Sequence, residues 1–233
     1  MELWYKELGF YNNPFSIKPL AFHDEIIGNN VREMISKIEK GNVLFIEGEY
    51  GNGKTSVLKK IIREFGGSRR LIYYSCNRAE KGIDFDNLLI GRYGIIGRIF
   101  KIKPKDMILL LDEAQELTPI DAEKLKDYYK KHFWSIVLVG HKYNDLQIDG
   151  FKEVIGENVI SLRKLSADEA VRLIRRRIGN INFLPDNIIK VIFEKSKTNP
   201  RRLLKNCEEV CKHAHSKGAR QVASEHINEA LKV

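Results

Sequence analysis

The sequence of 233 residues has little cysteine and no long apolar run. Three cysteines are too few for a disulfide framework, so we expect the protein to fold in the reducing cytoplasm. No stretch reaches the roughly 18 uninterrupted apolar residues of a membrane span, and residues 1–7 lack the basic-then-apolar layout of a signal peptide. These absences argue against secreted disulfide-rich proteins and membrane-spanning proteins.

Charge is plentiful and unevenly distributed. Hydrophobic residues make up 43% and charged residues 30% of the chain, a balance typical of a globular protein that buries a sizeable core. The formal net charge of +9 permits a nucleic-acid partner without demonstrating one. Residues 166–233 hold 14 Lys and Arg against 8 Asp and Glu, so most of the excess lies in the C-terminal third.

The most informative motif occupies residues 48–55 and fits the phosphate-binding pattern G-x-x-x-x-G-K-[ST]. Its glycines allow successive backbone N–H groups to point at one phosphate. Lys54 would reach the β- and γ-phosphates, and the Thr55 hydroxyl would coordinate Mg²⁺. An apolar run precedes the loop and helical periodicity follows it, as the motif requires. The predicted nucleotide-binding residues here are Gly48, Glu49, Tyr50, Gly51, Asn52, Gly53, Lys54, Thr55 and Ser56.

A second part of the site follows another apolar run, residues 107–111. Asp112 ends that run, where a carboxylate beside a phosphate loop can hold Mg²⁺ through its water shell. Glu113 is then placed to orient and polarise the attacking water. Ligands of open α/β sheets lie outside the carboxyl ends of strands, so the two motifs are consistent with one nucleoside triphosphatase site.

Apolar periodicity predicts strands at 43–46, 71–75, 107–111, 135–139 and 158–162, alternating with helices at 31–38, 55–65, 83–100 and 119–132. From Ser166 onward only helices are expected, beginning with a capping box at 166–169. We therefore predict an α/β fold with two domains. Residues 1–165 would form the nucleotide-binding core with an irregular leader, and residues 166–233 a helical domain.

With these motifs and this order of elements, the chain resembles AAA+ ATPases over nearly its full length. The resemblance is closest to archaeal origin-recognition and cell-division-control initiators and to the ATPases of DNA transposition and secretion operons. It rests on the phosphate loop, Leu-Asp-Glu-Ala-Gln at 111–115, Asn-Pro-Phe at 13–15, Ile-Ile-Gly at 26–28, and Thr-Asn-Pro-Arg-Arg-Leu-Leu at 198–204. It implies a five-stranded parallel sheet in the order 5-1-4-3-2, a helical lid, and ATP or ADP with Mg²⁺ as cofactors.

The resemblance also implies roles for four further residues. Ile26 and Ile27 would line the adenine pocket, although both fit an apolar core equally well. Arg201 would be the lid arginine that reaches the γ-phosphate. His141 occupies the "sensor 1" place, where the family more often has Asn, Thr or Gln, so a surface histidine is the alternative.

Two features of the family are missing. The stretch 151–158, before the last core strand, has no arginine finger, and Lys152 and Arg163 are the substitutes nearby. The winged-helix domain that initiators carry after the lid does not appear before Val233, which weighs against autonomous origin recognition.

We expect ATP-controlled work on DNA, such as replication initiation, helicase loading or transposition control. The alternative is a nucleotide-dependent switch that acts on a protein partner or neighbouring subunit, with weak hydrolysis and no DNA contact. We expect no membrane association.

Two segments keep alternative interpretations. Residues 91–105 combine spaced glycines with Arg and Lys and fit either a nucleic-acid contact or a solvated connector. Cys207, Cys211 and His215 lie at helical spacing and fit either a metal site or a buried apolar face.

Overall fold

The computed structural model describes residues 3–17, 29–68, 70–78 and 82–231. It divides into two compact units. One is the core unit, residues 30–162, and the other is the helical unit, which joins residues 1–29 to residues 163–233.

The core unit contains a five-stranded parallel sheet. Its strands are β1 (Val43–Glu47), β2 (Leu71–Ser75), β3 (Met107–Asp112), β4 (Phe133–Gly140) and β5 (Val159–Ser161). Their spatial order is β2-β3-β4-β1-β5, which confirms the predicted order read from the opposite edge. β1, β3 and β4 are almost wholly buried, as the near-continuous apolar runs indicated, whereas β2 is buried only at Leu71 and Ile72.

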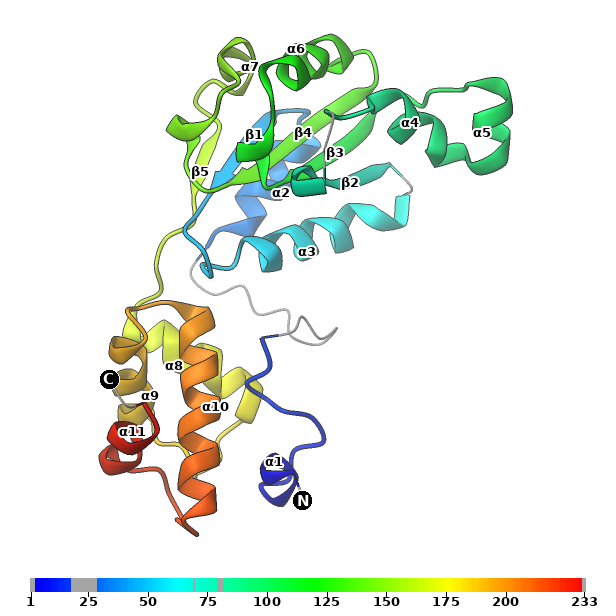
Figure 1. The fold of residues 1–233 in the computed structure, drawn as a ribbon. Coiled ribbons are helices and arrows are strands. Elements are labelled where there is room, and N and C mark those ends of the chain that lie inside the picture. The colour runs from blue at the N-terminus through cyan, green and yellow to red at the C-terminus, as the bar shows by residue number, and fades with distance from the viewer. Residues whose placement is uncertain (1–2, 18–28, 69, 79–81, 232–233) are drawn as a thin grey trace. The chain divides into compact units, whose positions relative to one another are not determined.

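Helices cover both faces of this sheet (Figure 1). On one face lie α2 (Val31–Glu39) and α3 (Lys54–Phe65), whose buried residues include Met34, Ile38 and Ile61. On the other face lie α4 (Phe85–Ile90), α6 (Pro119–Tyr128) and α7 (Asp149–Ile155). Between α4 and β3 the chain forms a 3₁₀ turn, Gly91–Tyr93, and α5 (Gly94–Phe100).

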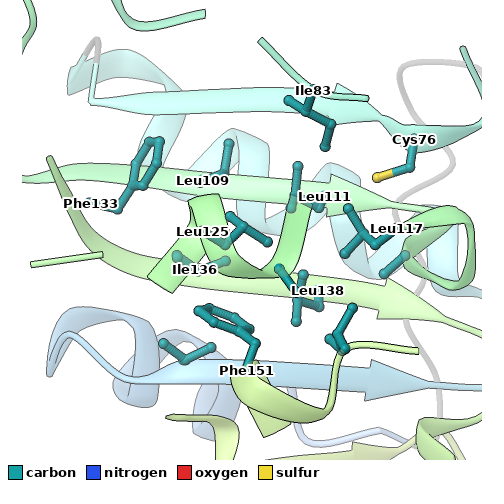
Figure 2. Packing of buried hydrophobic residues seen from close by; sticks show 14 of the residues in the cluster. Cys76, Ile83, Leu109, Leu111, Leu117, Leu125, Phe133, Ile136, Leu138 and Phe151 are labelled. Atoms are coloured by element: carbon teal, nitrogen blue, oxygen red, sulfur yellow. The ribbon is translucent and has the colours of Figure 1, made fainter. Parts of the chain in front are cut away.

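Alternate residues of the strands line the core cluster of this unit (Figure 2). Leu109 and Leu111 of β3 and Ile136 and Leu138 of β4 point to the face that α6 and α7 cover. Phe151 of α7 is fully buried in the same cluster. This packing holds the carboxyl ends of β1, β3 and β4 in one rigid layer, where the candidate site residues lie.

Several elements differ from the sequence-based expectation. The segment 83–100 holds two helices, α4 and α5, separated by a 3₁₀ turn, and the leader expected to be irregular contains a short helix, Trp4–Glu7. The helix predicted over 119–132 ends at Tyr128, because Tyr129 is extended and Lys130 is left-handed, with φ of 63°. This turn allows Phe133 to begin β4 inside the core. Helix α7 was not predicted: it has seven residues, and only Phe151 and Ile155 are buried.

The helical unit contains α1 (Trp4–Glu7), α8 (Ala167–Ile178), α9 (Asp186–Lys195), α10 (Pro200–Ser216) and α11 (Ser224–Ala230). Its own apolar cluster includes Phe15 from the N-terminal leader. The Asn13 side chain donates to Glu208 at 2.6 Å and accepts from the Phe15 backbone at 3.0 Å. The Asn-Pro-Phe motif therefore docks the leader onto the helices.

Among the described residues, no helix combines the length and apolarity needed to cross a membrane.

Candidate functional site

The phosphate loop connects β1 to α3 and is built for close backbone approach. Gly51 and Gly53 have φ of 88° and 93°, a left-handed conformation that other residues adopt at a cost of about 1–2 kcal/mol. A Cβ on Gly53 would meet no atom within 4 Å, so backbone conformation, rather than lack of space, requires glycine there. The N-terminus of the 12-residue helix α3 follows directly and offers free N–H groups to an anion.

Lys54 lies folded back into this loop. Its ammonium donates to the Gly48 carbonyl at 2.6 Å and lies 3.4 Å from the Glu49 carbonyl. Burial lowers the pKa of Lys54, while attraction to Glu113 and Asp112 acts in the opposite direction. The ammonium is therefore partly desolvated, and this desolvation strengthens its attraction to a phosphate placed in the loop.

Asp112 ends β3 with a half-buried carboxylate. Burial raises its pKa, and the hydrogen bond from the Glu113 backbone N–H to Oδ1, at 3.0 Å, partly offsets that rise. The Tyr73 hydroxyl of β2 donates to Oδ2 at 3.2 Å. These contacts fix the carboxylate at the carboxyl end of the sheet.

Glu113 has a left-handed backbone, with φ of 54° and ψ of 46°, which is uncommon outside glycine and marks a position fixed by its surroundings. Its Oε2 accepts a hydrogen bond from Gln115 Nε2 at 2.6 Å. His141 Nε2 lies 3.8 Å from the same oxygen. The structure thus brings the predicted catalytic Glu113 beside the predicted sensor His141.

The other predicted loop residues differ in exposure. Asn52 is buried, Ser56 is partly buried, and Glu49, Tyr50 and Thr55 are exposed. Thr55 sits in the first turn of α3, one residue after Lys54. No comparison tests the individual roles of these residues, so they stay predictions.

The residues at the end of the loop and of β3 fit Mg²⁺ as a cofactor. Mg²⁺ prefers oxygen ligands and keeps several waters, and Thr55 and Asp112 offer a hydroxyl and a carboxylate whose buried charge a cation would offset. Among the described residues, no group of three or more His, Cys, Asp or Glu side chains is arranged to hold a metal by itself.

The alternative metal site at Cys207 and Cys211 has no support in the structure. Both cysteines lie in the apolar cluster of the helical unit. Burial raises the pKa of each thiol, which disfavours the thiolate form that binds a metal. His215 instead faces Glu7, with 3.0 Å between Nε2 and a carboxylate oxygen.

Three predicted residues are not among the described residues of the core unit. Ile26 and Ile27 are outside the described residues. Arg201 belongs to the helical unit, where it is exposed in the first turn of α10. Both roles stay predictions.

The two candidate arginine-finger substitutes are engaged in ion pairs. Lys152 contacts Asp149 at 2.9 Å, and Arg163 forms a bidentate ion pair with the carboxylate of Glu169. Glu169 also caps α8 together with Ser166. Use of Lys152 or Arg163 on a neighbour's nucleotide would require these pairs to break.

Sequence reasoning assigned no role to Gln115 or Tyr73, although both contact the predicted acidic pair. Gln115 belongs to the recognised Leu-Asp-Glu-Ala-Gln string, which was the available signal. Ser75 of β2 pairs with Asp112 of β3. Tyr73 lies two residues before Ser75, so strand alternation places Tyr73 and Ser75 on the same face of the sheet. That contact could be found only after the strand register was known.

Comparison with solved structures gives the fold. ORC1 of Aeropyrum pernix in complex with DNA matches with a TM-score of 0.71 at 14% identity, over 94% of this chain and 69% of that one. ORC2 of the same organism, in ADPNP-ADP complexes, matches at 0.66 and 14% identity, over 94% and 70%. A RuvB variant of Thermotoga maritima matches at 0.69 and 16% identity, over 90% and 71%. No family model and no curated protein matches this sequence.

The chain has the AAA+ ATPase fold. It matches the Orc1/Cdc6 initiators and RuvB in structure at low sequence identity. At such identity the likeness shows the fold, and function must be argued from the site.

Proposed function

We propose that this protein is an ATPase that binds ATP with Mg²⁺ and hydrolyses its γ-phosphate. The observation that carries the proposal is the position of Lys54, which is folded onto the Gly48 carbonyl and attracted by the acidic pair of β3. A lysine held there meets the phosphates when they enter the loop. The two halves of the predicted site, although they are sixty residues apart in sequence, therefore belong to one electrostatic unit.

Each part of the site has a distinct task in this proposal. The loop N–H groups and Lys54 bind the phosphates and offset their charge. Thr55 and Asp112 would hold Mg²⁺, which neutralises charge that develops on the phosphate oxygens. Glu113 accepts a hydrogen bond from the attacking water and orients it, while Arg201 and His141 are the predicted contacts to the γ-phosphate.

We further propose that nucleotide state controls work on DNA. The helical unit carries a large share of the positive charge, and a neighbour in structure, ORC1 of Aeropyrum pernix, is seen in complex with DNA. A second candidate is a switch that acts on a protein partner with weak hydrolysis. The engagement of Lys152 and Arg163 in ion pairs favours it, because an arginine from a partner would then complete the site.

The test is ATP binding and ATP turnover for the wild type, Glu113→Gln and the matched control Glu116→Gln. Glu116 is exposed only three residues from Glu113. We expect Glu113→Gln to bind ATP but to lose at least about 100-fold in kcat, the usual scale of general-base loss, with Glu116→Gln unchanged. Failure of the wild type to bind ATP would refute the proposal, and equal turnover in all three proteins would remove Glu113 from the mechanism.

The DNA part is tested separately by duplex binding over a salt series. Phosphate contacts make log affinity fall linearly with log salt, so a steep slope and a DNA-stimulated ATPase rate support DNA work. ATP binding without any effect of DNA would favour the protein-partner switch.

A further inference from the structure

Helix α5 and the residues after it display an apolar patch. Exposed fractions are 77% for Ile95, 68% for Ile99, 70% for Phe100 and 44% for Ile102. Ile95 and Ile99 are one helical turn apart and share a face of α5. We call these four residues the α5 patch.

The patch is unusual for its density. Ten large hydrophobic residues are exposed in the described part of the chain, and four of them fall within residues 95–102. Single exposed apolar residues need no explanation, whereas a contiguous group with a polar rim marks an interaction surface. Figure 1 shows α5 beyond α4, away from the sheet of its own unit, and its main packing partners are α4 and the 3₁₀ turn before it.

The rim of the patch is positive. Residues 91–105 contain five Arg and Lys and no Asp or Glu. Lys103 is drawn back onto Asp86 at 2.7 Å and over the Tyr128 ring, whereas Lys101 and Lys105 are exposed. An acidic partner therefore meets complementary charge around an apolar centre, the arrangement of a protein interface with a polar rim.

We propose that the α5 patch binds an acidic amphipathic helix or loop of a partner protein. The apolar side chains are exposed and one basic side chain, Lys103, is held back on Asp86, which suits the apolar face of a helix or loop better than a phosphate backbone. A second copy of this chain is a poor occupant, since each copy carries +9. The proposal does not depend on the ATPase proposal, because the patch contains none of the nucleotide-site residues.

The test uses a displayed library of random 16-residue peptides, selected on the full chain and counter-selected on the variant Ile99→Ser/Phe100→Ser. Both side chains are exposed, so the variant should keep the wild-type melting temperature. Ile120→Ser is the matched control, because Ile120 is exposed to 65% on α6, a different helix. The best peptides and a 20-base-pair duplex are then titrated against all three proteins.

We expect the enriched peptides to be acidic and apolar, to bind the Ile120→Ser control normally, and to lose about 30-fold in affinity on the double variant, the scale of a truncated hot spot. Lys101→Glu/Lys105→Glu should slow their association. The proposal is overturned if no peptide depends on the patch, or if the enriched peptides are neutral or basic. Duplex binding that requires Ile99 and Phe100 overturns it as well and assigns the patch to nucleic acid.

Discussion

We expect loss of the buried Asp121 carboxylate to destabilise the core unit. Asp121 is 1% exposed in the first turn of α6. Its Oδ1 accepts the Ile83 backbone N–H at 2.8 Å, and its Oδ2 accepts the Thr118 N–H at 3.1 Å and the Thr118 hydroxyl at 2.7 Å. One side chain therefore caps α6 and ties the chain before α4 to it across 38 residues.

The cost of Asp121→Ala follows from the groups left without a partner. A buried donor without a partner costs about 1–3 kcal/mol. The backbone N–H of Ile83 would become such a donor, because Ile83 is only 1% exposed. Loss of half of a capping box adds about 1 kcal/mol, while the Thr118 hydroxyl can turn to solvent. We therefore expect the core unit to lose about 3 kcal/mol in its free energy of unfolding.

The assay is urea unfolding followed by the fluorescence of Trp134. The chain has two tryptophans, and a Trp4→Phe background leaves Trp134 of β4 as a reporter of the core unit alone, which matters because two units need not unfold together. Asp127→Ala, an exposed change on the same helix, is the control and should cost under about 0.5 kcal/mol. If Asp121→Ala costs less than about 1 kcal/mol and the Ile83 amide exchanges no faster with solvent, our reasoning about this carboxylate is wrong.

Three further predictions concern the nucleotide site and the helical unit. Lys54→Ala should weaken ATP binding about 100-fold or more, measured by titration calorimetry, because it removes a partly desolvated cation from the loop. Gln115→Met should lower kcat about tenfold with little change in KM, since the donor that orients Glu113 is lost; an unchanged kcat would show that the contact is only structural. For Glu169, contacts with Arg163 and Ser166 lower the folded-state pKa from 4.5 to about 2, so its stabilisation is fully present above pH 4.5 and is lost as the pH falls toward 2. The difference in unfolding free energy between wild type and Glu169→Gln, followed by Trp4 fluorescence in a Trp134→Phe background, should shrink over that range, and a constant difference would contradict the assignment.

Strongly patterned elements of the fold could be predicted from sequence, and elements fixed by distant partners could not. The strand-loop-helix at 43–65 follows from an apolar run, three glycines and helical spacing, and the structure has β1 and α3 there. The strand order came from family resemblance, because periodicity alone carries no information on which strands pair. Helix α7 was missed because it is only seven residues long and has three apolar residues and no side-chain cap, and the docking of the leader depends on Glu208, nearly two hundred residues away.

The same distinction applies to the candidate site. Lys54, Asp112 and Glu113 were predicted from their motifs, since the residue types and spacing are local. The contact from Gln115 to Glu113 required the left-handed backbone at Glu113, which no propensity suggests for a glutamate. Backbone geometry at the end of β3 therefore carries information that the motif string lacks.

That backbone geometry also connects the acidic pair to the neighbouring strand. A Cβ on Gly140, at the end of β4, would lie 3.1 Å from Gln115 Oε1 and 3.1 Å from the Phe45 ring, so a side chain at this position would displace the Gln115 amide or the ring. Glycine at 140 leaves room for the amide whose Nε2 donates to Glu113, and the next residue, His141, has its Nε2 3.8 Å from the same carboxylate oxygen. Displacement of His141 by a bound phosphate is therefore expected to change the direct approach of its ring to the Glu113 carboxylate.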